Sequence, residues 1–133
     1  MMGRHYSGEK DAVTGPKVAV IEGDDASPEA VRPVVDLIAG LVPEIEWQYP
    51  VVGEGAREQT GSPFPDESRD IIDKCDTTLF GATSTSSAIA LFYLRWGKQT
   101  YANVRPTRFL KGYRSSLVNP GGVDFLIVRE NLE

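Results

Sequence analysis

The chain has 133 residues, 41% of them hydrophobic and 25% charged, which is enough for a soluble domain with a packed core. Its net charge of −5 excludes general affinity for nucleic acid, so an anionic ligand needs a local cationic pocket. The lone Cys75 excludes an intrachain disulfide framework, and no stretch reaches the roughly 18 apolar residues of a membrane helix, so a reducing cytoplasm is expected.

The first part of the chain begins with strand and helix patterns. Residues 1–16 lack an apolar run and are expected to form a disordered tail. The β-branched run over 17–21 predicts a buried strand. Ser27 is placed to cap a helix of about three to four turns, in which apolar residues recur at helical spacing as far as Leu41.

The same alternation continues through the middle of the chain. Apolar residues at every second position predict a strand over 45–49, and Gly and Pro residues predict a loop over 53–65. The following segments are expected to be a helix over 66–74, a strand over 77–80 and a mostly buried helix over 88–96. Alternation of this kind predicts an α/β fold with a parallel sheet and right-handed crossovers. Ligands of such sheets bind beyond the carboxyl ends of the strands.

The pattern changes from Tyr101 onward, residues 109–120 show no clear period, and a further strand is expected over 125–129. Within this stretch Pro106 forces Arg105 into an extended conformation. A domain boundary is therefore expected near residues 100–108, with the final stretch starting a second unit.

Three arginines are candidates for binding an anion, namely Arg95, Arg105 and Arg129. Each guanidinium is a planar fork that stays charged and matches a carboxylate bidentately. Arg105 is held by the proline that follows it, and Arg129 ends an apolar strand, where a charge needs a partner. The alternative is that each arginine forms an ordinary ion pair or covers the surface. The arrangement suits a small substrate that carries several carboxylates.

The segment 81–87 is rich in hydroxyl groups and precedes a predicted helix. Its hydroxyl and amide groups are candidates for holding a carboxylate, a ribose or a phosphate, and the alternative is a plain helix cap with solvated serines. Asp24 and Asp25 follow Gly23 in a turn that lacks the repeated glycines of a dinucleotide or phosphate fingerprint. A surface turn is therefore favoured there over a metal site.

Several segments follow one another in an order that is known from a protein family. They are Val-Ala-Val-Ile-Glu-Gly-Asp-Asp-Ala-Ser-Pro-Glu over 18–29, Leu-Phe-Gly-Ala over 79–82, Leu-Arg over 94–95, Tyr-Ala-Asn-Val-Arg-Pro over 101–106, and the strand over 124–133 with its Val-Arg-Glu-Asn. Together they resemble the N-terminal part of the isocitrate/isopropylmalate dehydrogenase family, the β-decarboxylating dehydrogenases. The match runs from about Lys17 to the last residue, and the last two motifs in succession are highly specific.

The resemblance implies an incomplete form of the isopropylmalate dehydrogenase-like fold, with α/β layers around a parallel sheet. The first part of the large domain would occupy 17–104 and the start of the small domain 105–133. The implied substrate is a 2-hydroxy acid with a β-carboxylate, of the isocitrate, isopropylmalate, tartrate or malate type. NAD or NADP accepts the hydride, and Mg²⁺ or Mn²⁺ polarises the resulting ketone. The residues matched to substrate carboxylates are Arg95, Arg105 and Arg129, and those matched to the cofactor are Thr83, Ser84 and Thr85.

The sequence also departs from the family pattern. Asp25, Ala26 and Ser27 replace turn glycines, where close backbone packing favours the absence of a side chain. The family's catalytic tyrosine and lysine, its metal-binding aspartates and its adenosine-binding loops have no counterpart in this sequence. No catalytic residue and no metal ligand is therefore assigned, complete binding of NAD(P) or metal is not expected, and purified 1–133 is expected to show no dehydrogenase activity.

Two functional interpretations remain open. In the first, the chain is the front part of an oxidative decarboxylase whose chemistry is completed elsewhere. In the second, it is a non-catalytic, truncated paralogue that acts as a binding or structural subunit. The expected partners are a small hydroxy-dicarboxylate and a protein, which is a second copy as in a dimer, the missing half, or a full-length relative. No nucleic-acid or membrane partner is expected.

Overall fold

The computed structural model of the protein describes residues 15–131, which form two compact units. Unit 1 runs to Ile89 and unit 2 begins at Ala90. The disordered tail expected over 1–16 lies outside the described residues, apart from its last two positions. The division into domain parts over 17–104 and 105–133 stays a prediction.

Unit 1 is built on a three-stranded parallel sheet. Its strands are β1 (Lys17–Ile21), β2 (Glu46–Gln48) and β3 (Thr77–Phe80), in the spatial order β2-β1-β3. Val18 lies opposite both Trp47 and Thr77, which fixes the register on either side of the central strand. The central position explains the continuous apolar run of β1, because a parallel strand covered on both faces carries apolar residues on both faces.

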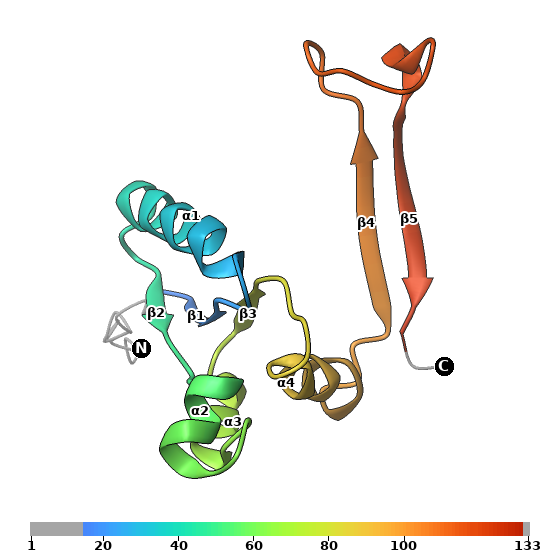
Figure 1. Ribbon diagram of the computed structural model, residues 1–133. Coiled ribbons are helices and arrows are strands. Elements are labelled where there is room, and N and C mark those ends of the chain that lie inside the picture. The colour runs from blue at the N-terminus through green and yellow to red at the C-terminus, as the bar shows by residue number, and fades with distance from the viewer. Residues whose placement is uncertain (1–14, 132–133) are drawn as a thin grey trace, which may run out of the picture. The chain divides into compact units, whose positions relative to one another are not determined.

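Helices cover both faces of this sheet. They are α1 (Ser27–Leu41), which links β1 to β2, and α2 (Glu54–Thr60) and α3 (Asp66–Asp73), which link β2 to β3. The first connection runs to one side of β1 and the second runs back across it, so two right-handed crossovers must lie on opposite faces. Figure 1 shows α1 on one side of the sheet and α2 with α3 on the other. The predicted α/β class with a parallel sheet is confirmed.

The core of unit 1 lies where the sheet meets these helices. Ile21 of β1 and Ile72 of α3 are almost completely buried, and Val35 is the buried residue of α1. Ser68 of α3 is buried as well, and its hydroxyl donates to the Val51 carbonyl oxygen over 2.6 Å. A fully buried Val, Leu or Ile side chain contributes about 1.5–3 kcal/mol. This layer therefore supplies the stability of unit 1.

Some expectations for unit 1 need correction. The loop expected over 53–65 contains α2, a seven-residue helix between Gly53 and Gly61, whose φ angles are 76° and 80°. Ser27 is the first residue of α1 rather than its cap, and no side chain caps this helix. β2 is three residues long, shorter than the strand predicted over 45–49. The bounds predicted for β1 and β3 are confirmed.

A helical segment leads into the strands of unit 2. α4 (Ala88–Phe92) continues as a π-helical turn, η1 (Tyr93–Gly97), in which the Lys98 N–H donates to the Tyr93 carbonyl oxygen. The Thr100 N–H bonds in the same way to Arg95, five residues before it. The prediction of one mostly buried helix over 88–96 is wrong, because the helix changes type within that span and Ala90 is its one buried residue.

The strands of unit 2 form a two-stranded antiparallel ribbon (Figure 1). β4 (Ala102–Arg108) and β5 (Asp124–Glu130) pair along their whole length, and a connection that contains a short 3₁₀ turn, η2 (Pro120–Gly122), joins them. Apolar side chains are exposed on both faces of the ribbon, including Val128, which is 65% exposed. A two-stranded ribbon by itself is at best marginally stable in water.

Candidate functional site

Two turns of unit 1 meet beyond the carboxyl ends of β1 and β3. In open parallel sheets with the strand order 2-1-3, the ligand crevice lies outside the carboxyl ends of the first and third strands. The Asp24 N–H donates to the Ala82 carbonyl oxygen over 2.9 Å. A Cβ atom at Gly23 would overlap that carbonyl oxygen, and one at Gly81 would overlap the carbonyl oxygen of Glu22. Both glycines are therefore required for the turns to approach so closely.

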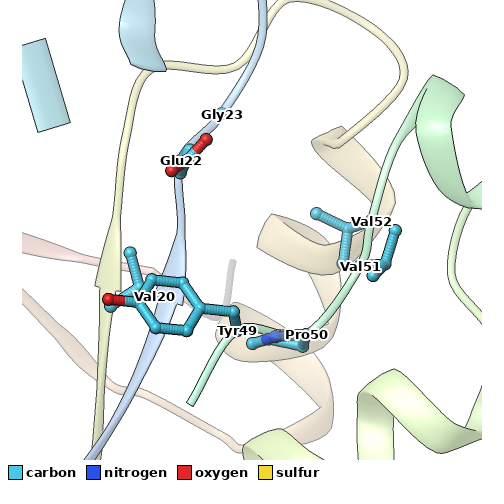
Figure 2. A pocket seen from close by; sticks show the side chains of 7 residues that line it. All are labelled: Val20, Glu22, Gly23, Tyr49, Pro50, Val51 and Val52. Carbon is cyan, nitrogen blue, oxygen red and sulfur yellow. The ribbon is translucent and has the colours of Figure 1, made fainter. Parts of the chain in front are cut away.

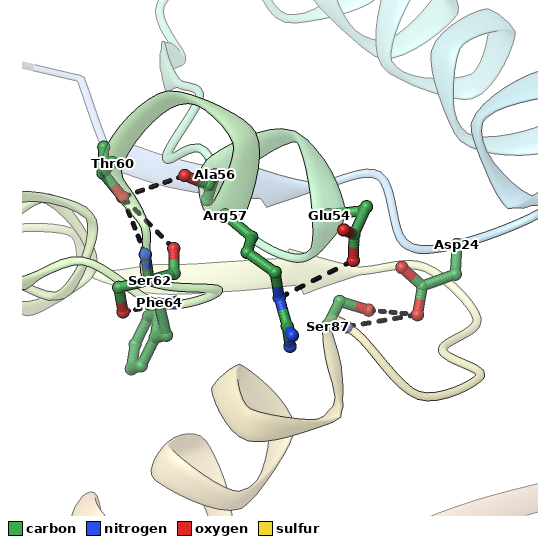
Figure 3. Close-up of polar contacts among 8 residues, drawn as sticks. All are labelled: Asp24, Glu54, Ala56, Arg57, Thr60, Ser62, Phe64 and Ser87. Atoms are coloured by element: carbon green, nitrogen blue, oxygen red, sulfur yellow. Dashed lines mark hydrogen bonds and ion pairs between the residues drawn. The ribbon is translucent and has the colours of Figure 1, made fainter.

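The carboxylate of Asp24 accepts several hydrogen bonds from the second turn, residues 81–87. Its Oδ2 atom accepts hydrogen bonds from the backbone N–H and the hydroxyl of Ser84, over 2.9 and 3.4 Å. It accepts two more from the N–H and hydroxyl of Ser87, over 3.3 and 2.8 Å, and Figure 3 shows this pair. Partial burial acts to raise the pKa of Asp24, but the hydrogen bonds together outweigh it, so the pKa lies below its ordinary value of 3.8. Asp24 is thus an ionised group at the centre of the turn.

Ser27 makes a further link between the turns. Its Oγ atom accepts a hydrogen bond from the Ala82 N–H over 2.8 Å. Nearby, Arg32 donates to both carboxylate oxygens of Glu22, over 2.9 and 2.7 Å, which ties the end of β1 to α1 and lowers the pKa of Glu22 mainly through the hydrogen bond. The one sequence signal for Ser27 was the resemblance, which matches this residue to a glycine of the family's turn.

The residues matched to the cofactor have different surroundings. Ser84 directs its amide and hydroxyl to Asp24. The Thr83 Oγ1 atom is buried, and no hydrogen-bond partner satisfies it among the described residues. Thr85 is exposed. A buried polar atom without a partner is the kind of group that a bound molecule satisfies, so the turn fits a hydroxyl-bearing or amide-bearing ligand.

A cleft lies beside the first turn, at the carboxyl ends of β1 and β2. Its volume is about 290 Å³, and Figure 2 shows the side chains that line it: Val20, Glu22, Gly23, Tyr49, Pro50, Val51 and Val52. The lining is mostly apolar, and its one charged side chain, Glu22, is already bound by Arg32. The cleft therefore offers a surface for a flat or apolar group rather than for an anion.

In unit 2 the pairing of the ribbon places two candidate arginines on one face. Arg129 lies opposite Asn103, and Arg105 is two residues further along the same strand as Asn103. Because side chains alternate between faces, Arg105 and Arg129 are diagonal neighbours, about 7–8 Å apart. The Arg105 Nε donates to the Asn103 side-chain oxygen over 3.3 Å. Arg108 lies on the other face, where it forms an ion pair with Asp124 at 3.6 Å.

The two arginines differ from Arg108 in their partners. Within residues 15–131, neither Arg105 nor Arg129 forms an ion pair, and Arg129 makes no side-chain hydrogen bond. Both are exposed, so their charge is available to a ligand. Arg95 belongs to η1, outside the two strands of the ribbon, and is half-buried. The structure thus brings two of the three predicted arginines together.

A divalent metal has no set of ligands in the described part of the chain. No three His, Cys, Asp or Glu side chains of residues 15–131 are grouped so that they would hold a metal ion. The residues present therefore do not fit the metal that the resemblance implies. In the same part of the chain, no helix is long and apolar enough to cross a membrane.

The fold is shared with solved decarboxylating dehydrogenases. The β-decarboxylating dehydrogenase of Thermococcus kodakarensis superposes with a TM-score of 0.67 at 30% sequence identity, over 89% of this chain and 34% of that one. The isocitrate dehydrogenase of Methylococcus capsulatus superposes with a TM-score of 0.75 at 29% identity, over 89% and 35%. The fold is thus that of the isopropylmalate and isocitrate dehydrogenases.

Sequence comparison leads to the same family. The family profile described as isocitrate/isopropylmalate dehydrogenase matches residues 17–133. The 3-isopropylmalate/3-methylmalate dehydrogenase of Methanocaldococcus jannaschii is 34% identical over 117 residues, which cover 88% of this chain and 34% of that protein. The 3-isopropylmalate dehydrogenase of Sulfurisphaera tokodaii is 36% identical over 121 residues, which cover 87% and 35%. The chain belongs to the isocitrate/isopropylmalate dehydrogenase family, and it spans about a third of the length of these relatives.

Proposed function

We propose that the chain carries the carboxylate-binding arginines of an NAD(P)-dependent oxidative decarboxylase that acts on 2-hydroxy acids with a β-carboxylate. Arg105 and Arg129 bind the carboxylates of the substrate, and Arg95 joins them when the substrate is bound. The observation that carries this proposal is the shared face of Arg105 and Arg129, since two guanidinium groups on neighbouring strands, neither in an ion pair with residues 15–131, match a small dicarboxylate.

The role proposed for the cofactor is limited to unit 1. NAD or NADP supplies the hydride acceptor in such a reaction. The exposed Thr85 and the turn around Thr83 contact the part of the cofactor that carries hydroxyl or amide groups, while Ser84 holds the turn in place. No step is assigned to a metal ion, because residues 15–131 offer no ligand set for one.

Binding of dicarboxylates tests the proposal directly. Isothermal titration of purified 1–133 with isocitrate, isopropylmalate, tartrate and malate is expected to detect binding of at least one of them, and acetate serves as the monocarboxylate control. Arg105→Ala or Arg129→Ala is expected to weaken that binding by about tenfold or more, because a hydrogen bond to a charged group is worth about 1.5–3 kcal/mol.

The ribbon offers a matched control for this experiment. Arg108→Ala removes the same charge from the same strand, but from the opposite face and from an ion pair with Asp124. It is expected to leave the dicarboxylate affinity within about twofold of that of the unchanged chain, because an exposed charge outside the site contributes little. Equal weakening by Arg105→Ala and Arg108→Ala would mean that net charge, rather than a site, attracts the ligand.

Turnover is proposed to need groups that this chain does not supply. We expect no reduction of NAD or NADP by purified 1–133 with any of the four acids and Mn²⁺. Reduction above the background of an Arg105→Ala, Arg129→Ala double variant would overturn this part of the proposal.

A binding or structural subunit is the second candidate function. The observation that favours it is the exposure of apolar side chains on both faces of the ribbon, such as Ile127 on one face and Val128 on the other. Such a subunit associates through the ribbon with a second copy or with a longer relative. Light scattering after gel filtration is expected to give a mass above 14.6 kDa, and a monomer at all concentrations would count against this role.

A further inference from the structure

The turn formed by residues 81–87 is held by the turn that precedes α1. Five hydrogen bonds cross between them through side chains. One joins Ala82 to Ser27, and four converge on the Oδ2 atom of Asp24 from Ser84 and Ser87. Charge-assisted hydrogen bonds are about twice as strong as neutral ones, so the cluster around Asp24 outweighs the single bond to Ser27.

We infer that Asp24 is a positioning residue, which with Ser27 fixes the turn 81–87 for a ligand, and that the turn is selective for uncharged ligand groups. The first part follows from the partners of the carboxylate. Ser84 and Ser87 donate both their amide and their hydroxyl protons to Asp24, so these donors are not available to a ligand. Thr85 is exposed and remains available to a ligand.

The preference for uncharged groups follows from the charge that Asp24 brings. A phosphate or carboxylate bound at this turn would lie within a few ångströms of an ionised carboxylate, and no cation among the described residues is bonded to Asp24 to offset it. Like charges in such proximity repel strongly at the low effective dielectric of a protein surface. A hydroxyl or carboxamide group carries no such penalty. The choice of ligand class rests on the proposed function, whereas the positioning role does not.

The link that Ser27 makes depends on two glycines. A Cβ atom on Gly23 or Gly81 would crowd the Ser27 hydroxyl, so the two glycines leave the space in which that hydroxyl reaches the Ala82 N–H. The Ser27 hydroxyl therefore adds a bond between the two turns without disrupting their packing.

Two isosteric variants separate the positioning role from a simple loss of charge. Asp24→Asn removes the carboxylate that accepts the four bonds, and Asp25→Asn removes the neighbouring carboxylate, which makes none of them. Hydrogen exchange followed by NMR is expected to show the Ser84 and Ser87 amides exchanging at least about tenfold faster in Asp24→Asn, with the amides of β1 unchanged. Asp25→Asn is expected to match the unchanged chain. Equal protection of the two amides in both variants would overturn the positioning role.

A third variant covers the case in which Asp24→Asn does not fold. Ser87→Ala removes one hydroxyl donor and leaves the carboxylate, and it is expected to speed exchange of the Ser84 amide by a smaller factor. No change in Ser84 exchange would contradict the shared anchoring of the two serines.

Inorganic phosphate tests the ligand class in the same spectra. Phosphate at millimolar concentration is expected to leave the amide shifts of residues 83–87 unchanged, and a saturable shift of Ser84 and Ser87 would overturn the preference for uncharged groups. Tartrate binding to the ribbon is measured separately, through Arg105 and Arg129. Failure there would remove the proposed function and leave the positioning role of Asp24 intact.

Discussion

Unit 1 buries the side chains of its central strand, whereas unit 2 exposes those of both its strands. Ile21 of β1 is 1% exposed, and Leu126 of β5 is 63% exposed. Yet each strand contains a run of four apolar residues, Val-Ala-Val-Ile in β1 and Phe-Leu-Ile-Val in β5. A continuous apolar run is typical of a strand that is covered on both faces. β5 therefore has the composition of a covered strand, while nothing in the described residues covers it.

Truncating one side chain in each strand tests this comparison with the largest expected effect. Ile21→Ala is expected to lower the free energy of unfolding of unit 1 by about 2–5 kcal/mol, through lost burial and a cavity. Leu126→Ala is expected to change it by less than about 0.5 kcal/mol, because the side chain is exposed.

The two tryptophans allow this measurement to be assigned to one unit. Trp47 lies in unit 1 and Trp96 in unit 2, so urea unfolding in a Trp96→Phe background is followed through Trp47 fluorescence alone. A Leu126→Ala variant that destabilised the Trp47 transition as much as Ile21→Ala would abolish the distinction between a packed unit 1 and an uncovered ribbon.

The meeting of the two turns gives the next largest effect. Gly81→Ala places a Cβ atom on the Glu22 carbonyl oxygen, and it is expected to destabilise unit 1 by about 2–3 kcal/mol. Gly40→Ala, near the end of α1 with open space around it, is the matched control and is expected to stabilise by about 0.5 kcal/mol. Changes of opposite sign in the free energy of unfolding, measured through Trp47, would support the close approach at Gly81. A Gly81→Ala variant as stable as the unchanged chain would refute it.

Sequence-based prediction succeeded where a structural feature has a local cause and failed where its cause lies elsewhere in the chain. β1 and β3 were predictable because short β-branched or apolar runs end at a glycine, Gly23 or Gly81. α2 was not, because its seven residues carry little apolar periodicity and its bounds are set by glycines with positive φ. The change from α4 to η1 could not be predicted either, since no local signal separates a π-helical turn from an α-helix.

For the candidate site, the residue types were predictable and their relations were not. The arginines stood out by chemistry, but the shared face of Arg105 and Arg129 depends on the ribbon register, which the long connection between β4 and β5 conceals. A surface turn was predicted at Asp24 because its hydrogen-bond partners, Ser84 and Ser87, are 60 and 63 residues away in the sequence. Side-chain pairs at such separation become visible only in the folded chain.

Acid is expected to affect unit 1 through the groups at the end of β1. The pKa of Glu22 lies below 4.5, mainly because of its hydrogen bond from Arg32, and the pKa of Asp24 lies below 3.8. A lowered pKa in the folded state gives stability that is present above the ordinary value and is lost as the pH falls through the folded-state value. The urea midpoint of the Trp47 transition is therefore expected to fall between pH 5 and pH 3, less steeply in a Glu22→Gln, Asp24→Asn variant. The urea midpoint of an Asp25→Asn variant should fall as it does in the unchanged chain. If the midpoint of the unchanged chain and of both variants fell equally with pH, Glu22 and Asp24 would not be the cause of the acid sensitivity.

The smallest expected effect comes from the same substitution made once in each unit. Asp25 of unit 1 and Gln99 of unit 2 are the described non-glycine residues with positive φ, at 55° and 51°. A left-handed conformation costs an L residue roughly 1–2 kcal/mol, and less for Asp, so a glycine at either position is expected to recover about 0.5–1 kcal/mol locally. Because unit 1 has its own core, Asp25→Gly should raise the Trp47 unfolding midpoint and Gln99→Gly should not. A rise of equal size from Gln99→Gly would show that the two units unfold together, and the contrast between a self-sufficient unit 1 and a dependent ribbon would then have to be given up.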